Sequence, residues 1–301
     1  MPERVPVQQL VTTKNGLRVF LSSQTTLGAK AWKTDSKTMT HNFTTEASGT
    51  WPGLILLAAA LLPACAPDVP SEPSAQRAKA RVVLAEARAA HGSDVLDSAT
   101  ITFGFRGQRF TARHFRDGGF RYTRAYAGTT DVLASDTLYR TVGGERQLLS
   151  AKERRDLATV VNSVVYFALL PEALADPAVR PRYLGADTVR GEQYHEIGVT
   201  FRKRGGGRDW RDRFVYWIHE RRHTIDYLAY YFHVDGGGSR FRKATGARTV
   251  GGARFQDYLN YKAATDTLGP EDIERFDEIM AAGGLEKVSE VRLDSVRVGE
   301  L

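Results

Sequence analysis

The chain has 301 residues, 42% of them hydrophobic, and a formal net charge of +7. This length and composition suit one domain with a sizeable hydrophobic core. No run of five or more Lys and Arg occurs, so the positive charge does not indicate a nucleic-acid-binding protein, for which a clustered basic face is expected. The single cysteine, Cys65, has no partner for an intrachain disulfide.

Cys65 closes the run Leu61-Leu62-Pro63-Ala64-Cys65, at the end of a short apolar stretch from Gly53 to Leu62. This pattern resembles a bacterial lipobox, which implies that the thiol carries a diacylglyceryl group and that the chain is cut just before it. The stretch has about ten residues, fewer than the roughly twenty needed to cross a membrane, so it suits the core of a signal peptide. The alternative interpretation of a lone cysteine is a buried free thiol.

The chain therefore divides into four segments. We expect a disordered leader or a wrongly assigned start over 1–38, a lipoprotein signal peptide over 39–64, a tether over 65–74 and a single half-barrel domain over 75–301. Ala66 stands where lipoprotein families place Asp for inner-membrane retention. The resemblance thus implies a lipid-anchored protein on the periplasmic face of the outer membrane. After cleavage, 36 Lys and Arg against 32 Asp and Glu would leave a net charge of +4, which permits contact with an anionic lipid surface.

A first helix is predicted to end at Gly92, in a left-handed cap that follows His91. We interpret His91 as a structural residue whose charge favours the helix dipole, with a ligand role as the alternative. The apolar stripe of this helix is predicted from residues at helical spacing, namely Ala78, Val82, Ala85 and Ala89.

Two further helices are expected. One begins at Ser150, where Glu153 completes a capping box, and ends at Pro171. Its broad apolar face must pack on a sheet and consists of Leu157, Val160, Val161, Val164, Val165 and Ala168. The other begins at Pro270 and stops at Gly283-Gly284.

The apolar period changes to two from Ala99 onward, over 101–105, 110–115 and 120–126, and again over Val288–Val298. Glycine in short turns predicts tight hairpins at 141–144, 188–191 and 249–252. Many strands with three amphipathic helices indicate an α+β fold. We expect a large curved antiparallel sheet, or half-barrel, with about three helices packed on one face.

Several short motifs recur in one group of proteins. They are Tyr183-Leu184-Gly185, Val189-x-Gly191-x-x-Tyr194, Tyr216-Trp217-Ile218, Asp226-Tyr227-Leu228-Ala229-Tyr230, Gly237-Gly238-x-Arg240-Phe241-Arg242-Lys243 and Arg254-Phe255-Gln256-Asp257-Tyr258. With these motifs, the chain from about Ala75 onward resembles a family of uncharacterised Gram-negative lipoproteins, a domain of unknown function. That family is similar in architecture to outer-membrane lipoprotein-sorting proteins, the lipoprotein-localisation factors, and other half-barrel proteins. The resemblance implies a fold, and function does not follow from fold alone.

The string His219-Glu220-Arg221-Arg222-His223 has the letters of the zinc-protease motif HExxH. That motif works on a helix, where His residues four apart share a face and bind zinc. Here β-branched and aromatic runs flank the string, which predicts two strands joined by a hairpin loop. Asp226 and Ala229 also stand where an extended motif needs Gly and His. We therefore interpret the match as fortuitous and predict no metal, no cofactor and no catalytic residue, with a zinc hydrolase as the third-ranked function.

Two glycine triplets, 205–207 and 236–238, are interpreted as flexible hairpin tips because no helix follows either one. Arg240, Arg242 and Lys243 come after the second triplet. The sequence favours a solvated basic strand edge for them over contact with an anionic head group.

Aromatic residues are concentrated in one part of the chain. Thirteen of the thirty lie between Phe201 and Tyr261. Since alternate residues of a strand face opposite ways, part of this set could line the concave side of the sheet. The candidate ligand-binding residues are Trp217, Tyr227, Tyr230, Tyr231 and Tyr258. The predicted function is non-catalytic binding of a lipid or other hydrophobic ligand by a membrane-anchored periplasmic protein. The alternative is a structural or partner-docking lipoprotein with a filled core.

The lipid anchor can be tested at Cys65. We expect Cys65→Ser to leave a soluble or uncleaved protein that takes up no labelled fatty acid, because no other thiol is present. Membrane fractionation with metabolic labelling measures both properties. Unchanged labelling of the Cys65→Ser protein would contradict the lipobox interpretation.

Overall fold

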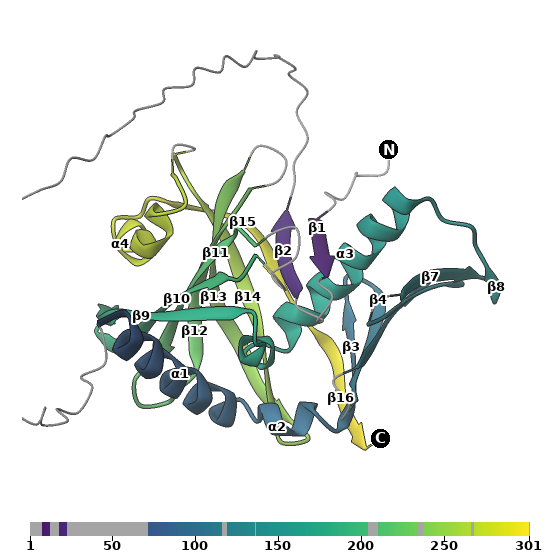
Figure 1. Cartoon of the computed structure of the whole chain (residues 1–301), viewed down its shortest axis with the longest axis horizontal. Coiled ribbons are helices and arrows are strands. Elements are labelled where there is room, and N and C mark those ends of the chain that lie inside the picture. The colour runs from purple at the N-terminus through teal and green to yellow at the C-terminus, as the bar shows by residue number, and fades with distance from the viewer. Residues whose placement is uncertain are drawn as a thin grey trace, which may run out of the picture. The chain divides into compact units, whose positions relative to one another are not determined.

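The computed structural model describes residues 8–12, 18–22, 72–115, 119–135, 137–203, 210–233, 237–265 and 268–300, the first two segments as backbone only. Cys65, the predicted signal peptide and the predicted tether as far as Ser71 lie outside the described residues, so the lipid anchor stays a prediction. Helix α1 (Glu72–Ala90) includes the last three residues of that tether. Within the predicted leader, β1 (Gln8–Thr12) and β2 (Arg18–Ser22) pair with each other and lie along helix α3 (Ala151–Ala168) (Figure 1).

The other strands described form two antiparallel sheets of seven. The first sheet has the order β16-β3-β4-β5-β6-β7-β8, from β3 (Ala99–Phe105), β4 (Gln108–His114), β5 (Phe120–Tyr126), β6 (Thr129–Ala134), β7 (Thr137–Val142), β8 (Glu145–Arg146) and β16 (Asp294–Glu300). The second sheet has the order β15-β14-β13-β12-β11-β10-β9, from β9 (Val179–Val189), β10 (Glu192–Phe201), β11 (Arg213–His219), β12 (Ile225–Phe232), β13 (Gly238–Val250), β14 (Ala253–Ala263) and β15 (Leu285–Val291). The remaining helices are α2 (Ser93–Leu96), η1 (Glu172–Ala175), η3 (Asp272–Arg275) and α4 (Phe276–Ala281).

The predicted α+β class with large antiparallel sheets is confirmed. In detail, the strands divide into two sheets, and the chain passes from one to the other between β15 and β16. Leu293 lies at this passage and is held to the second sheet through its backbone. Its N–H donates to Asp257 Oδ1 at 2.9 Å, and its carbonyl accepts from Arg248 Nη2 at 2.6 Å. These bonds fix the point where the chain leaves the second sheet.

Helix α3 lies between the two sheets and contributes to both cores (Figure 1). Val161 and Val165 pack with the first sheet, against residues such as Phe103 and Tyr122. Tyr166 and Phe167 pack with the second sheet. The single apolar face predicted for this helix is therefore too narrow, because its C-terminal half is buried nearly all round.

Both faces of the second sheet are buried. In the first sheet, only one face is covered by a helix. Along β11, Tyr216 joins the core under α1 and α3, while Trp217 joins a third cluster with Ile273 and Phe276. The predicted third helix is thus a short 3₁₀ turn and α4, and it covers the face opposite α1 and α3.

Local signals in the sequence predicted the turns and caps well. Ser150 and Glu153 form both hydrogen bonds of the capping box. Gly92 adopts a left-handed conformation with φ of 65°, as predicted after the first helix. Each of the three glycine turns joins two paired strands with positive φ at its glycines.

The apolar stripe predicted for the first helix is wrong. The helix buries Ala80, Val83, Leu84 and Ala87 against the second sheet. Val82, which belonged to the predicted stripe, has 58% of its surface exposed. Both stripes have helical spacing, and the sheet selects the one that contains Leu84, the largest apolar side chain of the helix.

His91 is structural, as predicted, but its charge does not favour the helix dipole. Burial, together with the positive charge of Arg254, lowers the pKa of His91 to about 4. The neutral ring accepts a hydrogen bond at Nε2 from the backbone N–H of Ile225 at 3.2 Å. His91 therefore connects the end of α1 to the start of β12.

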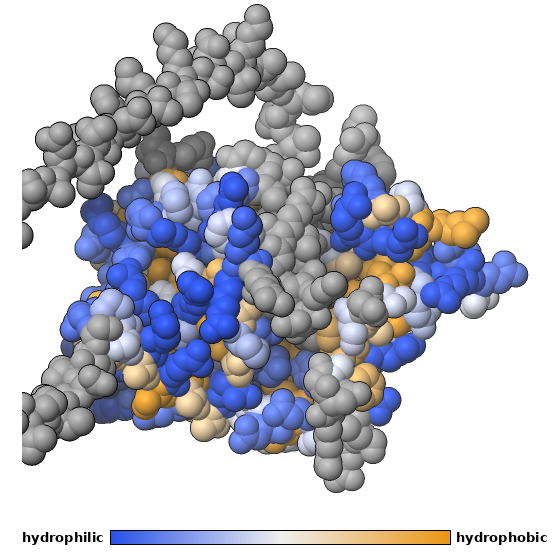
Figure 2. Space-filling view, in the orientation of Figure 1, coloured by the Kyte–Doolittle hydropathy of each residue, from blue (hydrophilic) through white to orange (hydrophobic). Residues whose placement is uncertain are grey.

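On the face seen in Figure 2, hydrophilic residues predominate and apolar residues appear between them. Within the part of the chain that the structure describes, no helix is long and apolar enough to span a membrane.

The state of His91 predicts a pH dependence of stability. The unfolded chain binds this proton near pH 6.5 and the folded chain near pH 4. We therefore expect the free energy of unfolding to fall by about 3 kcal/mol as the pH decreases through this window. Above pH 6.5, the protonation of His91 should no longer affect the free energy of unfolding. His91→Gln, whose amide oxygen can still accept from Ile225, should lose this part of the slope in denaturation curves recorded at a series of pH values. His223→Gln, at a half-buried position of the turn before β12, is the control and should keep the slope. An unchanged slope in His91→Gln would contradict the assignment.

Candidate functional site

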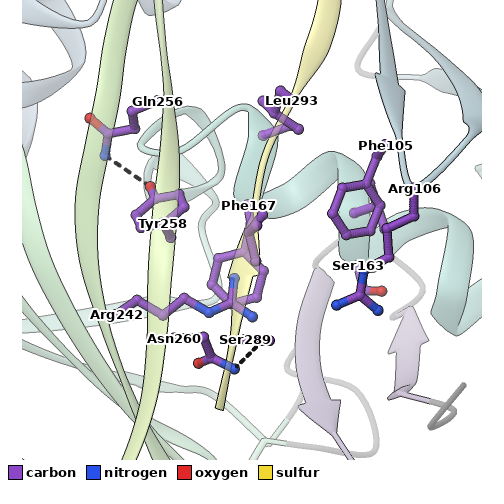
Figure 3. A pocket seen from close by; sticks show the side chains of 13 residues that line it. Phe105, Arg106, Ser163, Phe167, Arg242, Gln256, Tyr258, Asn260, Ser289 and Leu293 are labelled. Carbon is purple, nitrogen blue, oxygen red and sulfur yellow. Dashed lines mark hydrogen bonds between the residues drawn. The ribbon is translucent and has the colours of Figure 1, made fainter. Parts of the chain in front are cut away.

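A small cavity of about 50 Å³, partly open to solvent, lies where α3 faces the last strands of the second sheet. Its walls come from β3, α3, β13, β14 and β15, so both sheets and the shared helix contribute. The lining consists of Phe105, Arg106, Ser163, Val164, Phe167, Ala168, Arg242, Gln256, Tyr258, Asn260, Ser289, Val291 and Leu293 (Figure 3). This volume is below the roughly 300 to 1,000 Å³ that is usual for small-molecule sites, so the enclosed part of the cavity admits only the end of a ligand.

The polar side chains of the cavity lie mostly on one wall (Figure 3). Gln256 Nε2 donates to the Tyr258 hydroxyl at 2.9 Å and to the Ile225 carbonyl at 2.9 Å. Asn260 Nδ2 donates to Ser289 Oγ at 3.3 Å, and Asn260 Oδ1 is buried without a hydrogen-bond partner. This wall is preorganised by its own hydrogen bonds and still has an unused acceptor.

Arg242 is the charged group of this wall, and 2% of its surface is exposed. Its guanidinium carbon lies 3.5 Å from the centre of the Phe167 ring, a cation–π contact. Nη2 is 3.4 Å from the Tyr230 hydroxyl, and Nε is buried without a partner. No carboxylate of the described residues forms an ion pair with it. The solvated strand edge predicted for Arg242 is therefore wrong, because the side chain points into the fold.

The buried phenols near the cavity are neutral hydrogen-bonding groups. The hydroxyls of Tyr166 and Tyr216 are 2.9 Å apart. Burial raises the pKa of both, and it also raises the pKa of Tyr258. The described lining contains no His, Cys or carboxylate, so its chemistry is that of binding through apolar contact, hydrogen bonds and two cations, the buried Arg242 and the exposed Arg106.

The structure separates the five aromatic residues predicted to bind a ligand. Tyr230 and Tyr258 belong to the core under the helices, and Tyr258 lines the cavity. Trp217, Tyr227 and Tyr231 face the opposite way, toward η3 and α4. Strand alternation causes this separation, because residues 227 and 231 have the opposite parity to 230 on β12.

The HExxH string forms a hairpin turn, as predicted from its flanks. β11 ends at His219 and β12 begins at Ile225. His219 Nε2 lies 2.9 Å from Glu192 Oε2, a bond that is the main cause of the lowered pKa of Glu192, and Nδ1 accepts from the backbone N–H groups of Arg221 and Arg222. His223 Nδ1 is 3.5 Å from Glu86 of α1. The two histidines therefore have separate partners.

One group of potential metal ligands was not predicted from the sequence. Asp97, His114 and Glu172 place one ligand atom each within 4.8 Å of the others. Both ring nitrogens of His114 have hydrogen-bond partners, the Leu96 carbonyl at 3.3 Å and the Tyr122 hydroxyl at 2.6 Å. Burial is the main cause of the raised pKa of Asp97. These contacts favour a structural role for the group.

A second and larger hollow, of about 370 Å³, lies over β9, β10 and β11 of the second sheet, beside the start of α1 and η3. Its lining includes Arg77, Arg180, Arg182 and Arg213, with Glu271 and Glu274. Glu274 pairs with Arg182 and Glu271 with Arg213. A wall of exposed charges suits water, so an apolar ligand is better matched by the first cavity.

Residues 121–270 match a family of unknown function, DUF6503. This match confirms the resemblance to an uncharacterised family and covers β5 to β14, including α3. No curated protein matches the sequence.

Three solved bacterial structures are similar to the chain. A DUF1329 family protein from Desulfovibrio piger is 12% identical, with a TM-score of 0.43, and the match covers 72% of this chain and 92% of that one. A putative outer membrane lipoprotein-sorting protein domain from Vibrio parahaemolyticus is 11% identical, with a TM-score of 0.42 and coverage of 74% and 93%. A LolA superfamily protein from Nitrosomonas europaea is 11% identical, with a TM-score of 0.42 and coverage of 74% and 94%.

The hairpin geometry of the HExxH string predicts that it binds no zinc. Metal analysis of the purified protein should show no zinc in proportion to the chain. His223 is half-buried beside Glu86, so His223→Ala should lower the free energy of unfolding by about 1 kcal/mol or less. One zinc per chain in the wild type, lost on this substitution, would show that the string is a ligand set.

Proposed function

We propose that the protein binds a hydrophobic ligand, without catalysis, in the cavity between α3 and the second sheet. The single observation that carries this proposal is the cavity where the two cores meet. Its enclosed volume of about 50 Å³ accepts the end of a ligand, and the rest of the ligand extends through the open side. Phe105, Val164, Phe167, Val291 and Leu293 give it apolar walls, and a few polar groups lie on one side. Such a combination is typical of sites for small apolar molecules.

The location completes the proposed function. A lipid on Cys65 would hold the protein on the periplasmic face of the outer membrane, where acyl chains are abundant. The mild positive charge of the chain after residue 64 is compatible with an anionic lipid surface. Membrane attachment and acyl-chain binding are then two parts of one role at the same surface.

Filling the cavity tests this function without emptying a core. Val291 is partly buried and lines the cavity, so Val291→Trp should place a ring in the space that the ligand needs. We expect the affinity for a fluorescent polyene fatty-acid methyl ester to fall at least tenfold, with the free energy of unfolding within about 1.5 kcal/mol of the wild type. Fluorescence titration and chemical denaturation measure the two quantities.

The same strand provides a matched control. Val288 is 41% exposed and does not line the cavity, so Val288→Trp should leave ester binding unchanged. Substitution of Trp217, on the other face of the second sheet, should lower stability and leave the affinity of the folded protein unchanged. If the wild type shows no saturable binding of the ester, the cavity is not a ligand site and the alternative, a docking lipoprotein, is favoured.

A further inference from the structure

Among the residues that the structure describes, two arginines in the sheets are strongly buried, and they differ in their partners. Arg124, 7% exposed, pairs with Asp131 at 2.5 Å, and Arg140 approaches the same carboxylate at 2.6 Å. Arg242 is buried more deeply, at 2% exposed, and has no carboxylate partner among the residues that the structure describes. The first arrangement is a closed ion pair, whereas the second is a buried cation without an anion.

A buried charge without a counter-charge is unfavourable, because the group has lost its hydration. The Phe167 ring compensates for part of this loss through its negative face. The Tyr230 hydroxyl, at 3.4 Å, is a weak acceptor for one of the terminal nitrogens, and the Nε–H has no acceptor. The guanidinium therefore retains unsatisfied hydrogen-bonding capacity inside the cavity.

A second unsatisfied group lies across from the arginine. Arg242 and Asn260 are partners in the register of β13 and β14, and both line the cavity. Asn260 uses one amide atom on Ser289 and leaves the other buried without a partner. The two groups mark one end of the cavity as polar, and Phe105, Val164 and Leu293 provide apolar walls elsewhere.

We propose that Arg242 is a head-group site, and that the ligand is an amphiphile with an anionic head, a carboxylate or a phosphate. This inference rests on the proposed binding function and names the class of ligand. The oxygens of the head accept hydrogen bonds from the guanidinium. Asn260 joins the site with its amide turned over, so that Nδ2 donates to the head and Oδ1 accepts from the Ser289 hydroxyl. The apolar chain extends from there along Phe167 and Val164.

The test compares probes that share one chain and differ only in the head. The full chain is titrated with a fluorescent polyene fatty acid, with its methyl ester, and with the corresponding alkyl phosphate and alcohol. We expect wild-type protein to bind the acid or the phosphate at least tenfold more tightly than the ester and the alcohol. Whichever anion binds more tightly identifies the head group as a carboxylate or a phosphate.

Substitution of Arg242 should remove the preference and keep the cavity. Arg242→Met has a similar length and still covers Phe167, so the ester should bind within about twofold of wild type while the anionic probes lose their advantage. Lys243→Met removes the same charge from the adjacent residue, whose side chain is on the other face of β13, and should keep the preference.

The outcomes separate this inference from the proposed function. If wild-type protein binds the ester and the acid equally, the cavity is a ligand site but Arg242 is not a head-group site. If it binds none of the probes, the proposed function itself fails. Equal loss of the preference in Lys243→Met and Arg242→Met would indicate general attraction to positive charge and would also overturn the assignment. The wild-type comparison requires no substitution, so it decides the question even if Arg242→Met folds poorly.

Discussion

The structure depends on one helix serving two cores. The two seven-stranded sheets share α3, which packs on the first sheet through Val161 and Val165 and on the second through Tyr166 and Phe167. A helix has a diameter of about 10 Å with its side chains, so it can fill the space between two sheets only where they stay close to it. The cavity lies where the side chains of α3 do not fill this space, and Phe105 and Val291 are among the residues that line it. The helix that joins the two cores therefore also forms a wall of the site.

Much of the fold follows from local sequence signals. The capping box at Ser150, the left-handed Gly92 and the glycine turns depend on a few neighbouring residues, so they could be predicted without knowing the fold. The HExxH string shows the same principle. Its letters match a metal motif, but the β-branched flanks decide that it is a turn between β11 and β12.

The rest required tertiary information. The α1 helix offered two apolar stripes with equal spacing, and only the sheet selects Val83 and Leu84. The point where the chain leaves the second sheet for β16 is held by bonds from Asp257 and Arg248 to Leu293, residues far apart in the sequence. Among the aromatic residues, the register of β12 places Tyr230 toward the helices and Tyr231 away from them, a choice that a one-residue shift would reverse. The burial of Arg242 was not predicted either, because its charge suggested a place in solvent and the strand register that turns it inward could not be read from the sequence.

The two sheets differ in how firmly they are held. The second sheet has side chains packed on both faces, under α1 and α3 on one and under α4 on the other. The first sheet rests on α3 through one face, and its other face carries a row of neighbouring threonines at 102, 111 and 123. We therefore expect the two walls of the cavity to differ in stiffness, because β14 is packed on both faces and β3 on one. Under the proposed function, the first sheet would then set how much variation in ligand girth the protein tolerates.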